Sequence, residues 1–232
     1  MRFQQIILTV FAMFVPVLAS AQSTYPSISP TATYTDDNGV ETVTSTDFQG
    51  QAPLAVSFRA NPQNVDGLSP VYEWHFRRLG EAKDLMVRYE QDTEYTFTQA
   101  GQTNVTLVFR PDPTDEAVDS FTIAVTVSES KLVMPNAFSP NNDGRNDKYD
   151  VKEYQSLVEF HAYIFNRWGQ KLYEWTNPAK DNGWDGTYNG KPVKDGVYFV
   201  LVKARGADGI EYNIRRDVNL LRNFNVLEGG NP

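Results

Sequence analysis

The sequence predicts an all-β fold of two tandem immunoglobulin-like β-sandwich domains. Short runs in which apolar and polar residues alternate recur along the chain, and Gly, Pro and Asp separate them. This alternation is what a strand with one buried and one solvated face requires. The chain has 232 residues, of which 41% are hydrophobic. That length favours two domains, each with enough apolar side chains for its own core.

The amino terminus has the pattern of a cleaved secretory signal peptide over residues 1–21. Arg2 supplies the positive charge, residues 6–18 are almost wholly apolar, and Ala19-Ser20-Ala21 is a cleavage site of small residues. The apolar run is shorter than the roughly 20 residues that a membrane-spanning helix needs. No later stretch approaches that length, so we expect no transmembrane segment after signal cleavage.

Residues 22–46 are rich in Ser, Thr and Pro. This composition favours an extended linker, with one short strand around residues 40–44. A first domain is expected over residues 47–128, because five alternating runs follow one another there. The runs are Leu54 to Phe58, Tyr72 to Phe76, Tyr95 to Phe97, Val105 to Phe109 and Phe121 to Val127.

This first domain resembles a polycystic kidney disease (PKD) module, which is an immunoglobulin-like sandwich. The likeness is carried by Gly50-Gln51-Ala52-Pro53-Leu54, by Tyr72-Glu73-Trp74-His75-Phe76 and by Tyr95-Thr96-Phe97 before Ala100-Gly101. One departure is Arg77-Arg78-Leu79-Gly80, where the family usually has Gly-Asp-Gly. We expect Trp74 to anchor the core between the two sheets.

A second domain is expected over residues 129–224, followed by a flexible tail at residues 225–232. Residues 158–166 and 170–175 read as strands of a hairpin whose turn is Arg167-Trp168-Gly169. Residues 196–204 and 210–220 read as another pair. The periods are again those of strands.

Four turn-rich motifs follow one another in this second domain. Their residues are Pro135, Asn136, Phe138, Pro140 and Gly144; Asn166, Arg167, Trp168 and Gly169; Trp184, Asp185 and Gly186; and Gly196 and Tyr198. The block resembles the gliding motility-associated C-terminal domain, the type B sorting domain of the type IX secretion system in Bacteroidota.

The resemblance implies export through the periplasm to the cell surface or the extracellular space. It also implies that outer-membrane secretion machinery recognises the folded domain, for which exposed strand edges and loops are available. Such domains usually stop near Leu221-Arg222, so the residues from Asn223 to Pro232 are an extension that departs from the family.

Three of the four tryptophans, Trp168, Trp175 and Trp184, lie close together in the sequence. We expect them to fill the core of a small domain. The alternative is an exposed tryptophan platform that binds glycans.

The loop from Asn141 to Asp147 is the candidate metal site. Asn141, Asp143, Asn146 and Asp147 place oxygen ligands around Gly144, as in the front half of a calcium-binding EF-hand loop that lacks its final Glu. A structural calcium ion is therefore one interpretation. The other is a self-bonded Asx turn, in which these side chains accept hydrogen bonds from nearby backbone amides.

Composition and motifs exclude several classes of function. The net charge is −8, which disfavours nucleic acid as a partner. There is no Cys, and the two His residues, His75 and His161, fall in different domains. No catalytic residue is predicted, since no nucleophile elbow, zinc motif or phosphate loop occurs. Acidic pairs such as Asp36-Asp37 and Asp115-Glu116 occur, but a glycosidase with two carboxylates would need an apolar pocket to raise the pKa of its acid, and these pairs lie in loops without one.

The sequence therefore predicts a non-enzymatic exported protein whose PKD-like module serves adhesion or protein interaction. The alternatives are a carbohydrate-binding surface module and an accessory structural subunit of a secretion, gliding or filament assembly. The sequence names no protein or glycan ligand.

Overall fold

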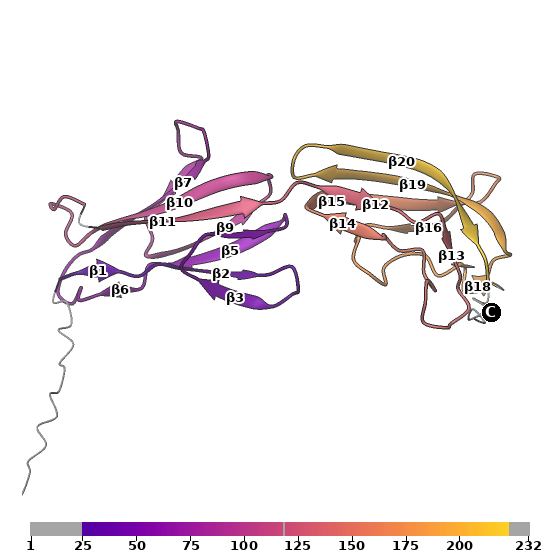
Figure 1. Ribbon diagram of the computed structural model, residues 1–232, viewed down its shortest axis with the longest axis horizontal. Helices are drawn as coiled ribbons and strands as arrows, with labels where there is room; N and C mark the ends of the chain where they lie inside the picture. The colour runs from indigo at the N-terminus through magenta and orange to yellow at the C-terminus, as the bar shows by residue number, and fades with distance from the viewer. Residues whose placement is uncertain (1–24, 118, 223–232) are drawn as a thin grey trace, which may run out of the picture.

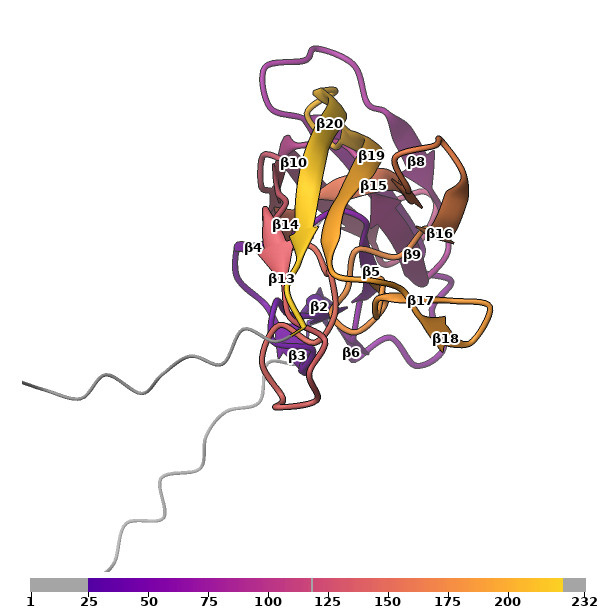
Figure 2. The same cartoon turned by 90° about the vertical axis from the view of Figure 1, so that its right-hand side faces the viewer.

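The structure is a computed structural model that describes residues 25–117 and 119–222. Within these residues every named secondary-structure element is a β-strand, so the predicted all-β class is confirmed. The strands form an N-terminal unit, residues 27–127, and a C-terminal unit, residues 131–222, arranged end to end (Figure 1). Figure 2 looks along the long axis from the side of the C-terminal unit. Within the described residues, no helix has the length and apolar character to cross a bilayer.

The N-terminal unit packs two sheets face to face. The five-stranded sheet has the order β4 (Phe48–Gly50), β11 (Asp119–Val127), β10 (Gly101–Arg110), β7 (Val71–Arg78) and β8 (Met86–Arg88). The four-stranded sheet has the order β3 (Glu41–Thr44), β2 (Thr31–Thr35), β5 (Leu54–Arg59) and β9 (Asp92–Phe97). A short ladder joins β1 (Ser27–Ile28) to β6 (Pro62–Gln63). The alternating runs predicted for residues 47–128 all lie in these strands.

The linker predicted over residues 22–46 is wrong for residues 27–44. Strand β2 pairs with β5 in the four-stranded sheet, and Ala32 beside Phe58 is fully buried. Tyr34 also stacks on Phe48, with ring centroids 4.1 Å apart. Thr and Tyr favour strands. In this run only Ala32 is buried, so the segment looks like a linker in sequence although it is a strand of the sandwich. The strand expected around residues 40–44 is β3.

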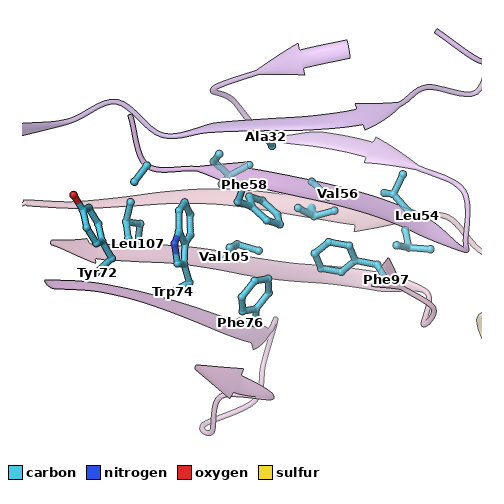
Figure 3. Close-up of a cluster of buried hydrophobic side chains, with 14 of the residues drawn as sticks. Ala32, Leu54, Val56, Phe58, Tyr72, Trp74, Phe76, Phe97, Val105 and Leu107 are labelled. Atoms are coloured by element: carbon cyan, nitrogen blue, oxygen red, sulfur yellow. The ribbon is translucent and has the colours of Figure 1, made fainter. Parts of the chain in front are cut away.

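Aromatic side chains from both sheets meet in the N-terminal core (Figure 3). Phe58 lies 5.7 Å from Trp74 and 5.8 Å from Phe76, centroid to centroid. Trp74 is 1% exposed, and its Nε1–H donates to the Glu90 carbonyl at 3.1 Å. The core role predicted for Trp74 is confirmed. The buried indole N–H is satisfied, so the ring adds apolar burial without an unpaired donor.

The C-terminal unit is built on one five-stranded sheet. Its order is β13 (Ala137–Phe138), β20 (Glu211–Leu220), β19 (Gly196–Gly206), β15 (Leu157–Phe165) and β16 (Lys171–Trp175). Short ladders join β12 (Lys131–Val133) to β14 (Glu153–Gln155) and β17 (Thr187–Tyr188) to β18 (Lys191–Pro192). Both predicted hairpins are present, as β15–β16 and β19–β20. Leu132, Met134, Tyr149 and Trp184, which come from the β12–β14 ladder and long loops, cover the inner face.

The two units meet through a buried junction formed by Ser156 and the β19–β20 turn. Ala207 in that turn is 8% exposed and belongs to the core of the N-terminal unit. Its carbonyl accepts a hydrogen bond from the Ala100 amide, and its own amide donates to the Ser156 carbonyl, both at 2.9 Å. The Ala52 amide donates to Ser156 Oγ at 3.2 Å. The Ala100–Ala207 and Ala52–Ser156 hydrogen bonds therefore join the two units in addition to the chain itself.

The predicted signal peptide, residues 1–21, and the predicted tail, residues 225–232, lie outside the described residues.

Candidate functional site

The four sequence motifs of the C-terminal unit lie together at the end away from the N-terminal unit. In Figure 1, β13, β18 and the end of β20 occupy this far end. A side chain added at Gly186 would meet Pro140 and Leu220 at 3.0 and 3.1 Å, so segments far apart in sequence pack against one another here. We refer to this region as the distal end.

Aromatic motif residues form the core beneath the distal end. Trp184 is fully buried between Phe138 and Tyr198, with ring centroids 5.4 and 5.0 Å away. The Trp184 Nε1–H donates to the Thr187 carbonyl at 2.8 Å, and the Tyr198 hydroxyl donates to the Lys194 carbonyl at 2.6 Å. Trp175 is 6% exposed, at the rim of the same cluster. The predicted core role is thus confirmed for Trp175 and Trp184.

Other motif residues build turns. The Asn166 side-chain oxygen accepts from the amides of Trp168 and Gln170, both at 3.0 Å. The Asp185 carboxylate accepts from the Thr187 amide at 2.9 Å in the same way. The motif glycines all have positive φ, the region that favours glycine: Gly144, Gly169, Gly186 and Gly196. These positions therefore shape the loops.

The proline and asparagine motif residues anchor the loop before and after β13. The Pro135 carbonyl accepts from the Tyr149 hydroxyl at 2.8 Å, and the Asn136 carbonyl accepts from the Asn219 amide at 2.9 Å. Tyr149 is fully buried, and burial raises the pKa of its hydroxyl strongly. Pro140 packs at Gly186, as described above. These contacts tie the first motif to the sheet.

Arg222 bonds several segments of the distal end to one another, a role that the sequence did not predict. Its guanidinium donates to the carbonyls of Val193 at 2.5 Å and Gly186 at 3.0 Å. Its backbone amide donates to the Asp195 carboxylate at 3.1 Å. The available signal for Arg222 was that domains of the resembled family usually stop near this residue. Arg222 thus fastens the end of β20 to the third and fourth motifs.

Trp168 is the exception among the motif aromatics. Its side chain is 76% exposed at the tip of the β15–β16 hairpin, so the expectation of a core role is wrong for this residue. The turn directs the side chain away from the sheet, and the Arg167 guanidinium stacks over the indole at 4.6 Å from its centroid. The exposed platform, kept as the alternative interpretation, matches this position.

A hollow of about 530 Å³ lies beside Trp168. It is lined by the hairpin tip, by Tyr188 and Val193, and by the start of β19. Gln170, which also lines the hollow, donates to the Tyr188 hydroxyl at 3.1 Å. Val197 and Phe199, in the start of β19, are 50% and 44% exposed. The hollow is therefore lined by both apolar and polar side chains.

The loop predicted as a calcium site is folded on itself. The Asp147 carboxylate accepts from the backbone amides of Asn141, Asn142 and Gly144, at 3.1, 2.6 and 2.8 Å. Asp143 accepts from the Asn141 side-chain amide at 3.0 Å and from the Arg145 amide at 2.8 Å, and these bonds lower the pKa of its carboxyl. The Asn146 carbonyl accepts from the Ser139 amide at 2.9 Å.

This bonding supports the Asx-turn interpretation, because backbone donors already occupy both carboxylates. In the described part of the chain, no group of three or more His, Cys, Asp or Glu side chains is placed to hold a metal ion. Asn and backbone oxygens are also calcium ligands, so the calcium site stays a prediction.

His75 lies in the N-terminal unit, far from the motifs, and His161 lies on the surface of the C-terminal sheet. His75 sits between Asp84 at 2.8 Å and Glu73 at 3.3 Å. The Arg110 guanidinium lowers the pKa of the Glu73 carboxyl, and Arg77 lowers that of Asp84. His161 contacts the Tyr163 hydroxyl at 3.2 Å. The charges around His75 therefore form a paired network on the outer face of β7.

Asp208, at the junction, is another residue that the sequence did not single out. Its carboxylate accepts from the Ser130 amide at 2.8 Å, from the Ser130 hydroxyl at 2.8 Å and from the Ile210 amide at 3.1 Å. It therefore holds the segment between the two units against the β19–β20 turn. An Asp-Gly turn dipeptide was visible in the sequence, but its partner lies 78 residues away.

Two solved structures are similar to this chain at low sequence identity. The FN1–FN3 domains of chicken CNTN1 share 9% identity at a TM-score of 0.27, over 78% of this chain and 70% of that one. A tetra-tandem repeat in the extending region of a large adhesion protein shares 13% at 0.30, over 84% and 67%. No curated protein matches.

A family model matches the C-terminal unit directly. The match covers residues 132–213, which contain all four motifs. It does not extend to the N-terminal unit, for which the PKD resemblance remains a prediction. The family that this match identifies is described as the CHU_C type IX secretion signal domain, and the C-terminal unit of this chain is similar to it over residues 132–213.

Proposed function

We propose that this chain is a non-enzymatic protein that the type IX secretion machinery delivers to the cell surface, with the N-terminal unit as its cargo. The observation that carries the proposal is the family match over residues 132–213. The predicted signal peptide would direct the chain into the periplasm first. Outer-membrane machinery would then recognise the folded C-terminal unit.

The surroundings of the titratable residues support a function without catalysis. Each ring nitrogen of His75 faces a carboxylate, and each of those carboxylates also pairs with an arginine. The carboxylates of Asp143 and Asp147 each accept backbone hydrogen bonds in a surface loop. A catalytic acid with a raised pKa would need an apolar pocket, which neither loop carboxylate has.

The N-terminal unit is proposed to act in adhesion or protein interaction. The connection between β7 and β8 projects from the sandwich (Figure 1). Three apolar side chains in and beside it are exposed: Leu79 by 65%, Leu85 by 46% and Tyr89 by 67%. We propose these side chains as the contacts with a protein partner.

A carbohydrate-binding function is the second candidate, and exposed Trp168 beside its hollow favours it. Sugar rings pack on exposed indoles, and the polar side chain of Lys194 lines the same hollow as Trp168. This candidate predicts glycan-array binding that is lost in Trp168→Ala. An accessory role in a secretion, gliding or filament assembly would instead give polymers without sugar dependence.

Cell fractionation tests the proposed function. The full chain is compared with a chain that lacks residues 131–232, both carrying the same tag in front of the N-terminal unit. We expect the full chain at the surface or in the medium, and the truncated chain inside the cell. Equal export of the truncated chain would show that the C-terminal unit is not the signal.

A folding control separates loss of the signal from loss of the fold. The truncated chain also loses the junction contacts of Ser156 and Ala207, so its N-terminal unit is checked by circular dichroism after purification. A folded but retained truncated chain supports the proposal.

A further inference from the structure

The motif residues of the C-terminal unit separate into those that build the fold and those that do not. Phe138, Trp184 and Tyr198 fill the core, while Asn166 and Asp185 bond the backbone of their own turns. Arg167 and Trp168 do neither. Arg167 stacks on Trp168, and Trp168 is 76% exposed. A motif residue that the fold does not use points to contact with another molecule.

Tryptophan and arginine are the residue types that most often dominate protein–protein binding energy. Here they adjoin further exposed apolar side chains, Val197 at 50% and Phe199 at 44%. Phe199 pairs with Phe165 across the strands, which extends the apolar strip along the sheet. We call Arg167, Trp168, Lys194, Val197 and Phe199 the Trp168 surface.

The charge of the Trp168 surface is opposite to that of the chain as a whole. Arg167 and Lys194 both line the hollow, and within residues 25–117 and 119–222 no carboxylate lies within salt-bridge distance of either cation. The carboxylate beside them, Asp195, is bonded by Arg222. The chain carries a net charge of −8. A cationic aromatic spot on an acidic protein is complementary to an acidic partner.

We propose that the Trp168 surface is the site at which an acidic loop of the outer-membrane secretion machinery binds this domain. The inference rests on the proposed function and names the site through which it acts. A protein partner is favoured over a glycan because the surface lies in the secretion signal domain and not in the cargo. The β15–β16 turn presents Trp168 at the distal end, where the N-terminal unit does not obstruct an approaching partner (Figures 1 and 2).

Export of full-length variants tests this site. Trp168→Ala removes the exposed ring, and Tyr154→Ala is the matched control, because Tyr154 is a 39% exposed aromatic on the short β12–β14 ladder of the same unit. We expect the surface fraction of Trp168→Ala to fall about tenfold, as for loss of a binding hot spot, and that of Tyr154→Ala to stay unchanged. Thermal unfolding should show both variants folded.

Charge variants at Arg167 test the acidic partner. Arg167→Glu should lower export as far as Trp168→Ala does, whereas Arg167→Lys keeps the charge and should retain most of it. These variants also serve if Trp168→Ala proves unstable, because among the residues that the structure describes the Arg167 guanidinium contacts the fold only by stacking on Trp168. Normal export of folded Arg167→Glu would overturn the proposal.

The outcomes separate this proposal from the proposed function. If the chain lacking residues 131–232 is exported normally, the secretion function itself fails. If that chain is retained but Trp168→Ala and Arg167→Glu are exported normally, the function stands and the Trp168 surface is not the binding site. Glycan binding that is lost in Trp168→Ala while export is normal would likewise overturn the proposal.

Discussion

The two ends of the C-terminal unit differ in how they use their side chains. At the junction end, Ser156 is 1% exposed and bonds both Ala52 and Ser128, while Asp208 bonds Ser130 and Ile210. At the distal end, Trp168 is 76% exposed. The junction end is hydrogen-bonded to the N-terminal unit and the connecting segment, whereas the distal end exposes the Trp168 indole to solvent.

This difference separates stability from recognition within one small domain. The aromatic cluster around Trp184 and the hydrogen bonds of the junction stabilise the fold. The Trp168 surface contributes little to it, because an exposed ring gains little from folding. A variant at Trp184 therefore reports on stability, and a variant at Trp168 reports on recognition. Trp184→Ala and Trp168→Ala make a matched pair.

Trp184→Ala should have the largest effect on stability. Trp184 is fully buried, donates to the Thr187 carbonyl and contacts two aromatic rings, so its loss leaves a large cavity. We expect a loss of about 3–5 kcal/mol in the free energy of unfolding, measured by urea denaturation of the whole chain. Trp168→Ala should change it by less than about 0.5 kcal/mol.

Equal losses in the two variants would contradict this assignment. A large loss in Trp168→Ala alone would mean that the indole stabilises the fold despite its exposure.

Asp208→Ala should have an intermediate effect, at the junction end. Burial opposes ionisation of the Asp208 carboxyl, but hydrogen bonds from Ser130 and Ile210 outweigh it and hold the pKa below its usual value. Removing a charged acceptor from these donors should lower stability by about 1.5–3 kcal/mol at neutral pH. Urea denaturation measures the loss, and Asp115→Ala in a surface turn is the control.

The same carboxylate predicts a pH dependence. Because the folded-state pKa lies below the unfolded one, ionised Asp208 stabilises the chain above the unfolded pKa of about 3.9. That contribution is lost as the pH falls through the folded pKa. The difference in melting temperature between the native chain and Asp208→Ala should therefore shrink as the pH is lowered from neutral to below the folded pKa. A constant difference would show that the carboxylate charge is not what matters.

Local patterns predicted the strands well. Period-two alternation from Leu54 to Phe58 and from Tyr72 to Phe76 placed β5 and β7, because one-sided burial requires it. The run from Thr31 to Thr35 was missed, since Thr-rich polarity matches a linker as well as a strand with only Ala32 buried. Composition describes a segment by itself, whereas pairing with β5 depends on a strand more than 20 residues away.

The candidate site was predicted in position but not in role. Trp168 and Trp184 both lie in Gly-containing motifs, and residue type alone does not tell a buried indole from an exposed one. The hairpin turn Arg167-Trp168-Gly169 was the available signal, because side chains at a turn tip point to solvent. The junction had no such signal, since Ser156, Ala207 and Ala52 meet only through the tertiary fold.

Calcium removal should have the smallest effect, and it tests the Asn141–Asp147 loop. Asp147 accepts three backbone amides and Asp143 accepts two donors, so we expect chelator to leave the melting temperature within about 1 °C of its value in calcium. A fall of several degrees, reversed by added calcium and absent in Asp147→Asn, would instead establish Asp143, Asn146 and Asp147 as ligands. In that case the loop would have to exchange backbone donors for a metal ion, and the distal end would depend on calcium for its shape. An unchanged melting temperature means that the turn is held by its own amides, so that the first motif needs no ion to keep its shape.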